Sequence, residues 1–441
     1  MTRPTSRAAR AAAPPGLLEE LRWRGLLHDC TPGLASRLAS GRPISGYNGF
    51  DPSGPSLHVG HLVPVFGLLH LQRHGGRPVA LVGGATGMIG DPSGASAERN
   101  LLDRDTIAAN AAAVRGQLGR FVDFSPGSGG AQMVNNLDWL GPLTMLDFLR
   151  DVGKHFTVPY MLGKESVQQR LERGLSFTEF SYMLLQSADF LHLYRTMGVE
   201  MQMGGADQWG NITAGLELIR RVEGVGEDGE SPAHGIAYPL LTDPSGAKFG
   251  KTAAGTSVWL DPALTSPFAF YQFWLNAEDA VVGRLLRYFT LFSRAEIDAL
   301  EADGAARPEA RPGQRALARD ITARVHGDQE TDNARVASEA IFGGSVAGLS
   351  PAQKSFVAQV IERASPIPRT SFASGLSAAQ IAVSSNTVTS MSEARRLILQ
   401  GGLYINDERI TDANELVPEP DDGRLFIRVG KRRYLLVPVE D

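Results

Sequence analysis

The chain has 441 residues but only one cysteine, Cys30. A single cysteine excludes a disulfide framework and any zinc site built from several cysteines. Such low cysteine use fits a reducing compartment, and we therefore expect a cytoplasmic protein. Apolar residues make up 43% of the chain, yet no run of them approaches the roughly 20 residues that a membrane-spanning helix needs. The composition predicts a folded protein with a sizeable core and no membrane partner.

Positive charge is not in excess either, with 43 Lys and Arg against 48 Asp and Glu. A net charge of −5 argues against a protein that coats nucleic acid with its whole surface. A local basic patch is nevertheless enough to bind phosphates. Residues 1–15 contain arginines and alanines but lack the apolar segment of a secretory signal. We expect residues 1–15 to form a flexible tail, and an organelle transit peptide is the alternative.

From Gly16 to about residue 235, predicted strands alternate with predicted helices. The clearest unit is a strand over 43–50, a helix over 61–76 and a buried strand over 77–84. A strand–helix–strand unit of this length predicts a parallel sheet. The other elements expected in this region are helices over 17–29, 176–198 and 206–222 and strands over 199–205 and 235–243. We therefore expect an α/β domain over residues 16–265.

The pattern changes after this domain. Residues 266–343 have helical periodicity and predict an all-α domain. Residues 344–384 are rich in Ser, Pro and Gly and predict a loosely packed connector. Residues 385–441 predict a compact α+β unit, with a helix over 388–402 followed by strands over 403–410 and 423–439.

A Gly-rich loop, GGATGMIG, follows the strand at residues 77–84. It has neither the lysine of a P-loop nor the spacing of GxGxxG, so a generic dinucleotide enzyme is only a weak alternative. Glycines at this point allow the backbone to approach a ligand closely. The tetrapeptide DPSG occurs at Asp51, Asp91 and Asp243. The first two copies follow strands, where the loops of an α/β sheet bind ligands, and the third is interpreted as an ordinary turn.

The segment HVGH places His58 and His61 at the start of a predicted helix, on either side of Gly60. One interpretation is structural, with one histidine capping the helix and the other exposed. A metal site would need a third ligand, and the remaining histidines form no cluster with this pair. In the third interpretation both imidazoles bind a phosphate at a helix N-terminus, which already favours an anion. That interpretation requires a cationic loop elsewhere, and KFGKT supplies Lys248 and Lys251.

These two motifs resemble the HIGH and KMSKS motifs of class I aminoacyl-tRNA synthetases. Further segments resemble bacterial tyrosyl-tRNA synthetase in the expected order: YNGFDPSGPSLHVGH, VALVGGATGMIGDPSG, DVGKHF, SFTEFSYMLLQSADF, GGADQWGNITAGLELIRR and KFGKT. The resemblance covers nearly the whole chain. It implies a Rossmann-type catalytic domain with a parallel sheet, a helical anticodon-side domain and a small RNA-binding domain like that of ribosomal protein S-four, in a homodimer.

The resemblance implies a two-step reaction. Tyrosine attacks the α-phosphate of ATP to give tyrosyl-adenylate and pyrophosphate, and the tyrosyl group then moves to the terminal adenosine of tRNA(Tyr). No prosthetic group and no resident metal are implied, and Mg²⁺ arrives with ATP. Because no covalent enzyme intermediate forms, catalysis consists of positioning and charge stabilisation.

The resemblance also implies roles for single residues. Residues expected at the ATP phosphates and pyrophosphate are His58, His61, Ser53, Lys248 and Lys251, and those expected at the rest of ATP are Gly60, Gly205, Asp207 and Arg99. Residues expected at tyrosine are Asp91, Tyr182 and Gln186 for the ammonium group, Gln208 for the carboxylate, and Tyr47 and Asp189 for the phenol. Candidate tRNA contacts are Arg220, Arg221, Arg395, Arg396 and Arg432, for which a solvated charged surface is the alternative.

The chain departs from the family's pattern at a few positions. Ala95 and Ser96 stand where a lysine often begins the mobile loop, Asn48 replaces a small residue or cysteine, and Pro64 lies early in the helix after HVGH. These departures bear on rate and on a second-copy role rather than on reaction type. Two alternatives stay open: a tryptophanyl-tRNA synthetase, against which the pair Tyr47 and Asp189 argues, and a silent paralogue that binds RNA.

Overall fold

A computed structural model describes the chain over residues 16–91, 102–127, 129–164, 167–168, 171, 174–225, 231–242, 249–250, 255–343, 345–346, 348–430 and 433–441. The expected tail over residues 1–15 lies outside this description. The chain forms two compact units. Unit 1 contains residues up to Thr265 together with Ala277–Leu317, and unit 2 contains Ser266–Asn276 and Ala318–Asp441.

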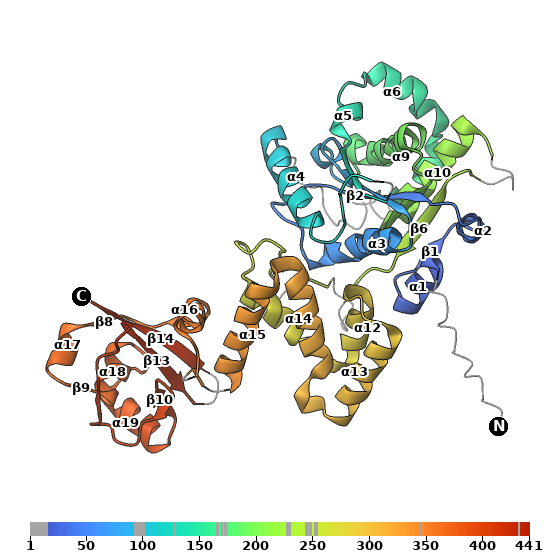
Figure 1. Ribbon diagram of the computed structural model, residues 1–441. Coiled ribbons are helices and arrows are strands. Elements are labelled where there is room, and N and C mark those ends of the chain that lie inside the picture. Colours follow the sequence, from blue (N-terminus) through green and yellow to red (C-terminus); the bar gives the residue numbers. More distant parts are fainter. Residues whose placement is uncertain are drawn as a thin grey trace, which may run out of the picture. The chain divides into compact units, whose positions relative to one another are not determined.

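Unit 1 is built on a six-stranded sheet (Figure 1). Its strand order is β1-β6-β5-β2-β3-β4, comprising Asp29–Cys30, His234–Tyr238, Met201–Gly205, Ser45–Phe50, Arg77–Val82 and Gln132–Asn135. All neighbouring strands are parallel except the edge strand β1, which pairs antiparallel with β6. The prediction of a Rossmann-type α/β domain with a parallel sheet is confirmed.

The predicted strand–helix–strand unit consists of β2, helix α3 (Leu62–Arg73) and β3. Pro64 lies in the first turn of α3, where its missing N–H leaves no helical hydrogen bond unmade. Two other predicted elements end earlier than expected. Helix α1 (Leu17–Arg24) stops because Gly25 adopts a left-handed φ of 76° and closes the helix. Strand β6 stops at Tyr238 because the next residue is a proline.

Two long helices pack together on this sheet and supply much of the site. Helix α9 (Phe177–Met197) begins with a capping box between Ser176 and Glu179. Helix α10 (Trp209–Glu223) follows β5 through a short 3-10 turn. Apolar residues of both helices form one core with β3, including Phe190, Leu193 and Ile212. The sequence analysis did not predict helices α4 (Arg104–Leu118), α5 (Leu137–Leu140), α6 (Met145–Asp151) and α7 (Val158–Leu162), nor strand β4.

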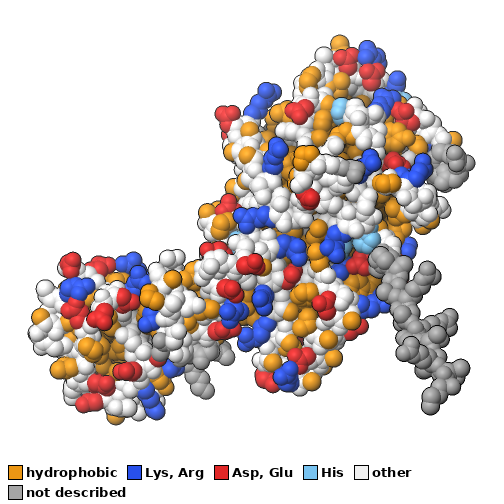
Figure 2. All heavy atoms as spheres, in the orientation of Figure 1, with side chains coloured by type: hydrophobic (Ala, Val, Ile, Leu, Met, Phe, Trp, Pro, Cys, Tyr) orange, Lys and Arg blue, Asp and Glu red, His pale blue; other side chains and the backbone are white. Residues whose placement is uncertain are grey.

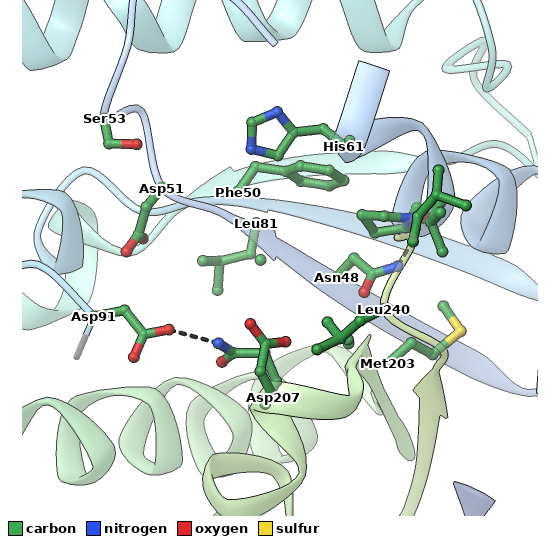
Figure 3. Close-up of a pocket in the computed structure, with 18 of the residues that line it drawn as sticks. Asn48, Phe50, Asp51, Ser53, His61, Leu81, Asp91, Met203, Asp207 and Leu240 are labelled. Carbon is green, nitrogen blue, oxygen red and sulfur yellow. Dashed lines mark hydrogen bonds between the residues drawn. The ribbon is translucent and has the colours of Figure 1, made fainter. Parts of the chain in front are cut away.

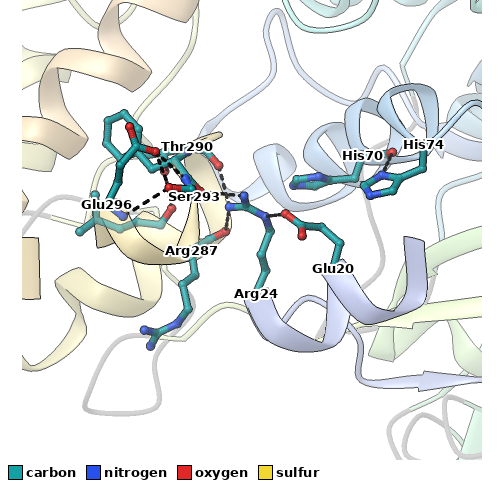
Figure 4. A network of polar contacts seen from close by, with 10 residues as sticks. Glu20, Arg24, His70, His74, Arg287, Thr290, Ser293 and Glu296 are labelled. Carbon is teal, nitrogen blue, oxygen red and sulfur yellow. Dashed lines mark hydrogen bonds and ion pairs between the residues drawn. The ribbon is translucent and has the colours of Figure 1, made fainter. Parts of the chain in front are cut away.

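A buried arginine fastens α1 to the rest of unit 1 (Figure 4). The Arg24 guanidinium donates to Glu20 at 2.6 Å and to the main-chain oxygens of Arg287, Thr290 and Phe292 at 2.8–2.9 Å. These oxygens lie at the end of α12 (Asp279–Phe289) and just before α13 (Arg294–Ala306). The N-terminal helix and two helices about 260 residues later in the chain therefore share one polar network.

Unit 2 contains helices α11 (Pro267–Leu275), α15 (Asp328–Gly343) and α16 (Pro351–Val360) and a second sheet. Helix α14 (Pro312–His326) runs from the last residues of unit 1 into unit 2. The order of the second sheet is β11-β10-β13-β14-β7, with β8 also pairing with β14. Its strands are Glu408–Arg409, Leu403–Ile405, Arg424–Val429, Arg433–Glu440, Glu362–Arg363 and Ile367–Pro368. One core joins this sheet to helices α18 (Ala378–Ser384) and α19 (Met391–Leu399), and another joins it to α15 and α16.

The structure differs from the expected domain boundaries. Residues 266–343 do not form one separate unit, because Ala277–Leu317 belongs to unit 1 and the rest to unit 2. The expected connector over 344–384 contains α16, β7, β8, α17 (Thr370–Ala373), β9 (Leu376–Ser377) and α18. Two of its helices begin with capping boxes, Ser350 with Gln353 and Ser377 with Gln380. The serines that suggested a loose connector therefore start helices.

Candidate functional site

Unit 1 contains a cavity of about 590 Å³ at the carboxyl ends of β2, β5 and β6 (Figure 3). This is the edge of a parallel sheet where α/β proteins bind ligands. Twelve residues predicted from the sequence line it: Tyr47, Ser53, His58, Gly60, His61, Asp91, Tyr182, Gln186, Asp189, Gly205, Asp207 and Gln208. The first and the last of them, Tyr47 and Gln208, are 161 positions apart (208 − 47), and the fold brings them to one place. Arg99, Lys248, Lys251 and Arg432 lie outside the described residues.

At one end of the cavity the two histidines are held by the backbone. His58 caps a 3-10 turn (Val59–His61), and its Nδ1 accepts a hydrogen bond from Gly60 N at 3.0 Å. Nδ1 of His61 accepts from His58 N at 3.1 Å, and the ring centroids are 3.9 Å apart. Because Nδ1 is an acceptor in both rings, the proton of each neutral imidazole is on Nε2. The capping interpretation is therefore correct for His58, and each ring keeps a donor at Nε2.

Asp189 is buried in the cavity wall with both carboxylate oxygens bonded. Trp139 Nε1 donates to Oδ1 at 2.8 Å, and Asn136 Nδ2 donates to Oδ2 at 2.9 Å. Burial raises the pKa of Asp189 to about 7, although these two hydrogen bonds act in the opposite direction. Tyr47 lies in the same wall, with its ring 5.4 Å from that of Phe190. Its buried hydroxyl has no hydrogen-bond partner among the described residues.

Between these ends lies a group of carboxylates and amides. Tyr182 Oη donates to Asp51 Oδ2 at 2.7 Å. Gln208 Nε2 donates to Asp91 Oδ2 at 2.6 Å, as the dashed line in Figure 3 shows. Burial raises the pKa of Tyr182, and the nearby negative charges of Asp51 and Asp91 raise it further. This part of the cavity concentrates negative charge and is suited to an ammonium group.

Sequence reasoning missed four residues of this network: Asp51, Thr86, Asn136 and Trp139. Thr86 Oγ1 donates to Asp51 Oδ1 at 2.7 Å and accepts from Asn136 Nδ2 at 3.0 Å. A chain of hydrogen bonds therefore runs from Tyr182 through Asp51, Thr86 and Asn136 to Asp189. The repeated DPSG tetrapeptide was an available signal for Asp51, which opens its first copy as Asp91 opens its second. Asn136 and Trp139 lie after the unpredicted strand β4 and had no such signal.

Two glycines of the Gly-rich loop have a packing role that the sequence analysis did not predict. A Cβ on Gly83 would lie 1.9 Å from Asp51 Oδ1, and a Cβ on Gly84 would lie 2.2 Å from Asn135 Oδ1. These glycines make room for polar side chains of neighbouring loops. The expectation that this loop lets the backbone approach a ligand stays a prediction.

The four candidate RNA-binding arginines with described positions do not line the cavity. Arg220 and Arg221 lie near the end of α10 and both pair with Glu217 of the same helix. Arg395 and Arg396 are exposed on α19 of unit 2. Among the residues with described positions, no group of three or more His, Cys, Asp or Glu side chains could hold a metal ion.

Two family models match the chain. The model for class I tRNA synthetases (W and Y) matches residues 39–343, and the model for a tyrosine–tRNA ligase SYY-like C-terminal domain matches residues 359–437. The second match begins inside the expected connector, in agreement with the regular elements found there.

Similar proteins extend over almost the same length. A tyrosine–tRNA ligase of Roseiflexus castenholzii is 49% identical over 429 residues, which is 96% of this chain and 99% of that protein. One from Geobacillus stearothermophilus is 46% identical over 430 residues, again 96% and 99% of the two chains. The solved structure of a C-terminally truncated mitochondrial tyrosyl-tRNA synthetase of Aspergillus nidulans is 30% identical, with a TM-score of 0.64 over 74% of this chain and 94% of that one.

Proposed function

Since this chain belongs to the bacterial tyrosyl-tRNA synthetases of class I, we propose that its cavity aligns tyrosine and ATP for attack of the carboxylate on the α-phosphate. The chain is a tyrosine–tRNA ligase: it uses ATP to form tyrosyl-adenylate and pyrophosphate and transfers the tyrosyl group to tRNA(Tyr). The observation that carries the assignment of roles is the single cavity with two Nε2–H imidazoles at one end and the Tyr47–Asp189 wall at the other.

Charge stabilisation belongs to the histidine end. Negative charge grows on the leaving pyrophosphate, and fixed donors there stabilise the transition state more than the ground state. His58 and His61 supply two such donors, and Ser53 lines the same end. Lys248 and Lys251 add positive charge together with the Mg²⁺ that arrives with ATP. In support, Phe249 and Gly250, which stand between the two lysines in the sequence, line the cavity.

The remaining ATP contacts follow from the cavity lining. Gly60, Gly205 and Asp207 are proposed to bind the nucleoside. Arg99, which is not among the described residues, is proposed to contact the phosphates. The Asp207 carboxylate suits the ribose hydroxyls, which donate hydrogen bonds. A Cβ on Gly205 would lie 2.5 Å from Asp207 Oδ1, so a larger residue at 205 would displace that carboxylate.

Tyrosine binding belongs to the other end. Asp91, Tyr182 and Gln186 are proposed to hold the ammonium group, with Asp51 behind Tyr182, and Gln208 to meet the carboxylate. Tyr47 and Asp189 are proposed to bind the phenol, one as donor and the other as acceptor. The buried hydroxyl of Tyr47 gains a partner when tyrosine binds, and phenylalanine leaves both groups unsatisfied. This family is itself the standard example of such rejection, at roughly 10⁵-fold.

The transfer step requires tRNA(Tyr), for which unit 2 offers the exposed Arg395 and Arg396. The proposed contacts to the phosphate backbone of the tRNA also include Arg220, Arg221 and Arg432. Such contacts weaken as the salt concentration rises. The reaction is proposed to take place in the cytoplasm. No helix of the described part of the chain is long and apolar enough to cross a membrane.

We also infer a homodimer. Unit 1 exposes large apolar side chains on α6, α7 and the start of α9, and large exposed apolar surfaces are typical of protein–protein interfaces. The most exposed are Met145 at 72%, Leu146 at 78%, Val158 at 60% and Phe177 at 74%. In Figure 2 hydrophobic side chains reach the surface in the region of α6.

We expect Leu146→Glu to convert a dimer into monomers in sedimentation, whereas Val225→Glu, which also changes an exposed apolar residue, leaves the mass unchanged. A wild-type monomer would contradict the inference.

The test of the proposed function is tyrosine-dependent exchange of labelled pyrophosphate into ATP, without tRNA. We expect exchange with tyrosine and not with phenylalanine or tryptophan. His58→Ala should lower the rate about 100-fold, the cost of removing one preorganised donor. Exchange with tryptophan alone would overturn the assignment of Tyr47 and Asp189, and absence of exchange with all three would overturn the proposed adenylate chemistry.

A further inference from the structure

A short antiparallel ladder joins the histidine turn to the segment that follows KFGKT. Val59 N donates to Val258 O at 3.0 Å and Leu260 N donates to Leu57 O at 2.8 Å, so that His58 and Trp259 face each other as a bridged pair. The ladder is reinforced where Asp261 N donates to Ser56 Oγ at 3.2 Å. The main chain thus fixes the distance between the turn that contains His58 and residue 259.

The side chain of Trp259 uses this fixed position. Its ring meets the His58 imidazole edge to face, with centroids 5.9 Å apart and an interplanar angle of 65°. The same indole covers Gly54 in the first DPSG turn, where a Cβ would lie 3.5 Å from two of its ring atoms. Trp259 N donates to Thr265 Oγ1 at 2.9 Å, which holds residue 259 from its other side. The indole therefore fills the space between the DPSG turn and the imidazole.

The segment that contains Val258 and Trp259 also contacts Gly250, which belongs to the KFGKT motif. Val258 N donates to Gly250 O at 2.9 Å, and Gly250 has a φ of 106°. A Cβ on Gly250 would lie 2.9 Å from Val59 Cγ2 and 3.4 Å from Gly60 N. Gly250, Val258 and the histidine turn are therefore in mutual contact.

Three contacts already orient the His58 ring: the cap to Gly60, the neighbouring His61 ring and the Trp259 edge. The cap and His61 belong to the same short turn and move with it. Among these three contacts, Trp259 is the one that comes from another segment, and it therefore links the orientation of the ring to a part of the cavity outside the turn. A donor that stabilises a transition state must be held within a fraction of an ångström.

We propose that Trp259 is a positioning residue for His58 in the proposed activation of tyrosine, and that it does not contact either substrate. Its indole keeps Nε2 of His58 directed at the phosphate. The proposal rests on the proposed function, because it assigns His58 to the ATP phosphates. It predicts that removing the Trp259 indole lowers the reaction rate only when the His58 imidazole is present.

The test is a double-mutant cycle on pyrophosphate exchange. We expect Trp259→Ala to lower kcat about tenfold or more with the KM for tyrosine unchanged within twofold, because only the phosphate end is misplaced. Trp259→Phe keeps an aromatic edge and should restore most of the rate. Once His58 is alanine, adding Trp259→Ala should cost less than twofold. Trp23→Ala is the control, since it removes another half-buried indole of unit 1.

A second readout does not depend on activity. The ring-carbon resonance of His58 in histidine-labelled protein, assigned by its loss in His58→Ala, should shift in Trp259→Ala and not in Trp23→Ala. Equal losses of rate from Trp259→Ala with and without His58, or an unshifted resonance, would overturn the proposal. Failure of the proposed function is distinguishable, because it appears as absent exchange in the wild-type chain while the resonance still reports on the contact.

Discussion

At the scale of single residues, Asp189 shows how burial and hydrogen bonding divide the control of one carboxyl group. Burial raises its pKa to about 7 from an ordinary 3.8, despite donors from Asn136 and Trp139. In the folded chain the carboxyl keeps its proton up to about pH 7, whereas the unfolded chain releases it near pH 4. The stability that this protonation contributes is present below pH 4 and is lost as the pH rises through 7.

A pH dependence of unfolding follows for Asp189. Relative to Asp189→Asn, the wild-type free energy of unfolding should fall by roughly 3 kcal/mol between pH 5 and pH 8. The reason is that each pH unit between pH 5 and the folded pKa lowers the free energy of unfolding by about 1.4 kcal/mol. Urea unfolding at four pH values, followed by a signal from unit 1, measures the difference. Parallel curves for the two proteins would show that Asp189 is already ionised at pH 5.

Single residues were predicted from the sequence where a motif names them and missed where only the fold brings them in. His58, Tyr182 and Asp189 stand in recognisable segments, and the cavity contains all three. Asn136 and Trp139 follow a four-residue strand whose burial pattern is mostly intermediate, and no periodicity marks such a strand. Their hydrogen bonds to Asp189 connect positions about 50 residues apart, which local sequence does not encode.

At the scale of elements, the fit of α3 against β6 depends on one glycine. A Cβ on Gly67 would lie 1.8 Å from the hydroxyl and 2.3 Å from Cζ of Tyr238, whose side chain is fully buried. Because neither the ring nor the helix can move without disturbing the core, we expect Gly67→Ala to lower the free energy of unfolding by roughly 3 kcal/mol, the upper range for overpacking.

A matched control is available for this substitution. Gly116 is also inside a helix, α4, and a Cβ there would meet nothing within 4 Å. Gly116→Ala should therefore stabilise the chain by roughly 0.5–1 kcal/mol, the helix propensity gained. Thermal unfolding of both variants checks the pair. Equal effects at the two sites would mean that the Tyr238 ring can relax away from α3.

The elements themselves were predictable in proportion to their length and regularity. Helix α9 and the strands β2 and β3 have clear periodicity and were predicted within a few residues. The short elements between residues 351 and 384 were taken for a connector because their serines and prolines also favour turns. A serine that is followed three residues later by a glutamine, as Ser350 is by Gln353, indicates the start of a helix rather than a turn.

At the scale of the whole molecule, unit 2 contains parts of two domains that the sequence analysis expected to be separate. Its sheet packs on one face against α18 and α19, which includes the exposed Arg395 and Arg396, and on the other against α15 and α16. The residues facing α15 include Phe426, Tyr434 and Leu436, all buried. The proposed RNA-binding surface is thereby built on the helices through a shared core.

A set of hydrogen bonds to Asp407, which we call the clasp, links three parts of unit 2 and leads to a prediction for the charging of tRNA. Asn406 and Asp407 form the tight turn between β10 and β11, with φ values of 50° and 70°. From this turn, Asp407 accepts hydrogen bonds from Ser345 Oγ at 3.1 Å, from Val346 N, and from Tyr434 Oη at 3.3 Å. The carboxylate thus joins the hairpin, the sheet and the segment after α15.

We expect Asp407→Ala to loosen the hairpin against the segment after α15 and to raise the KM for tRNA(Tyr) several-fold, since hydrogen bonds to a charged group stabilise by about 1.5–3 kcal/mol. Pyrophosphate exchange without tRNA should stay within twofold of wild type, because every residue found to line the cavity belongs to unit 1. Asp412→Ala is the control: this exposed carboxylate caps only the turn at Asn414. Parallel losses of exchange and charging would instead mean that the clasp supports the stability of the entire chain, and unchanged charging would show that tRNA binding tolerates a mobile hairpin.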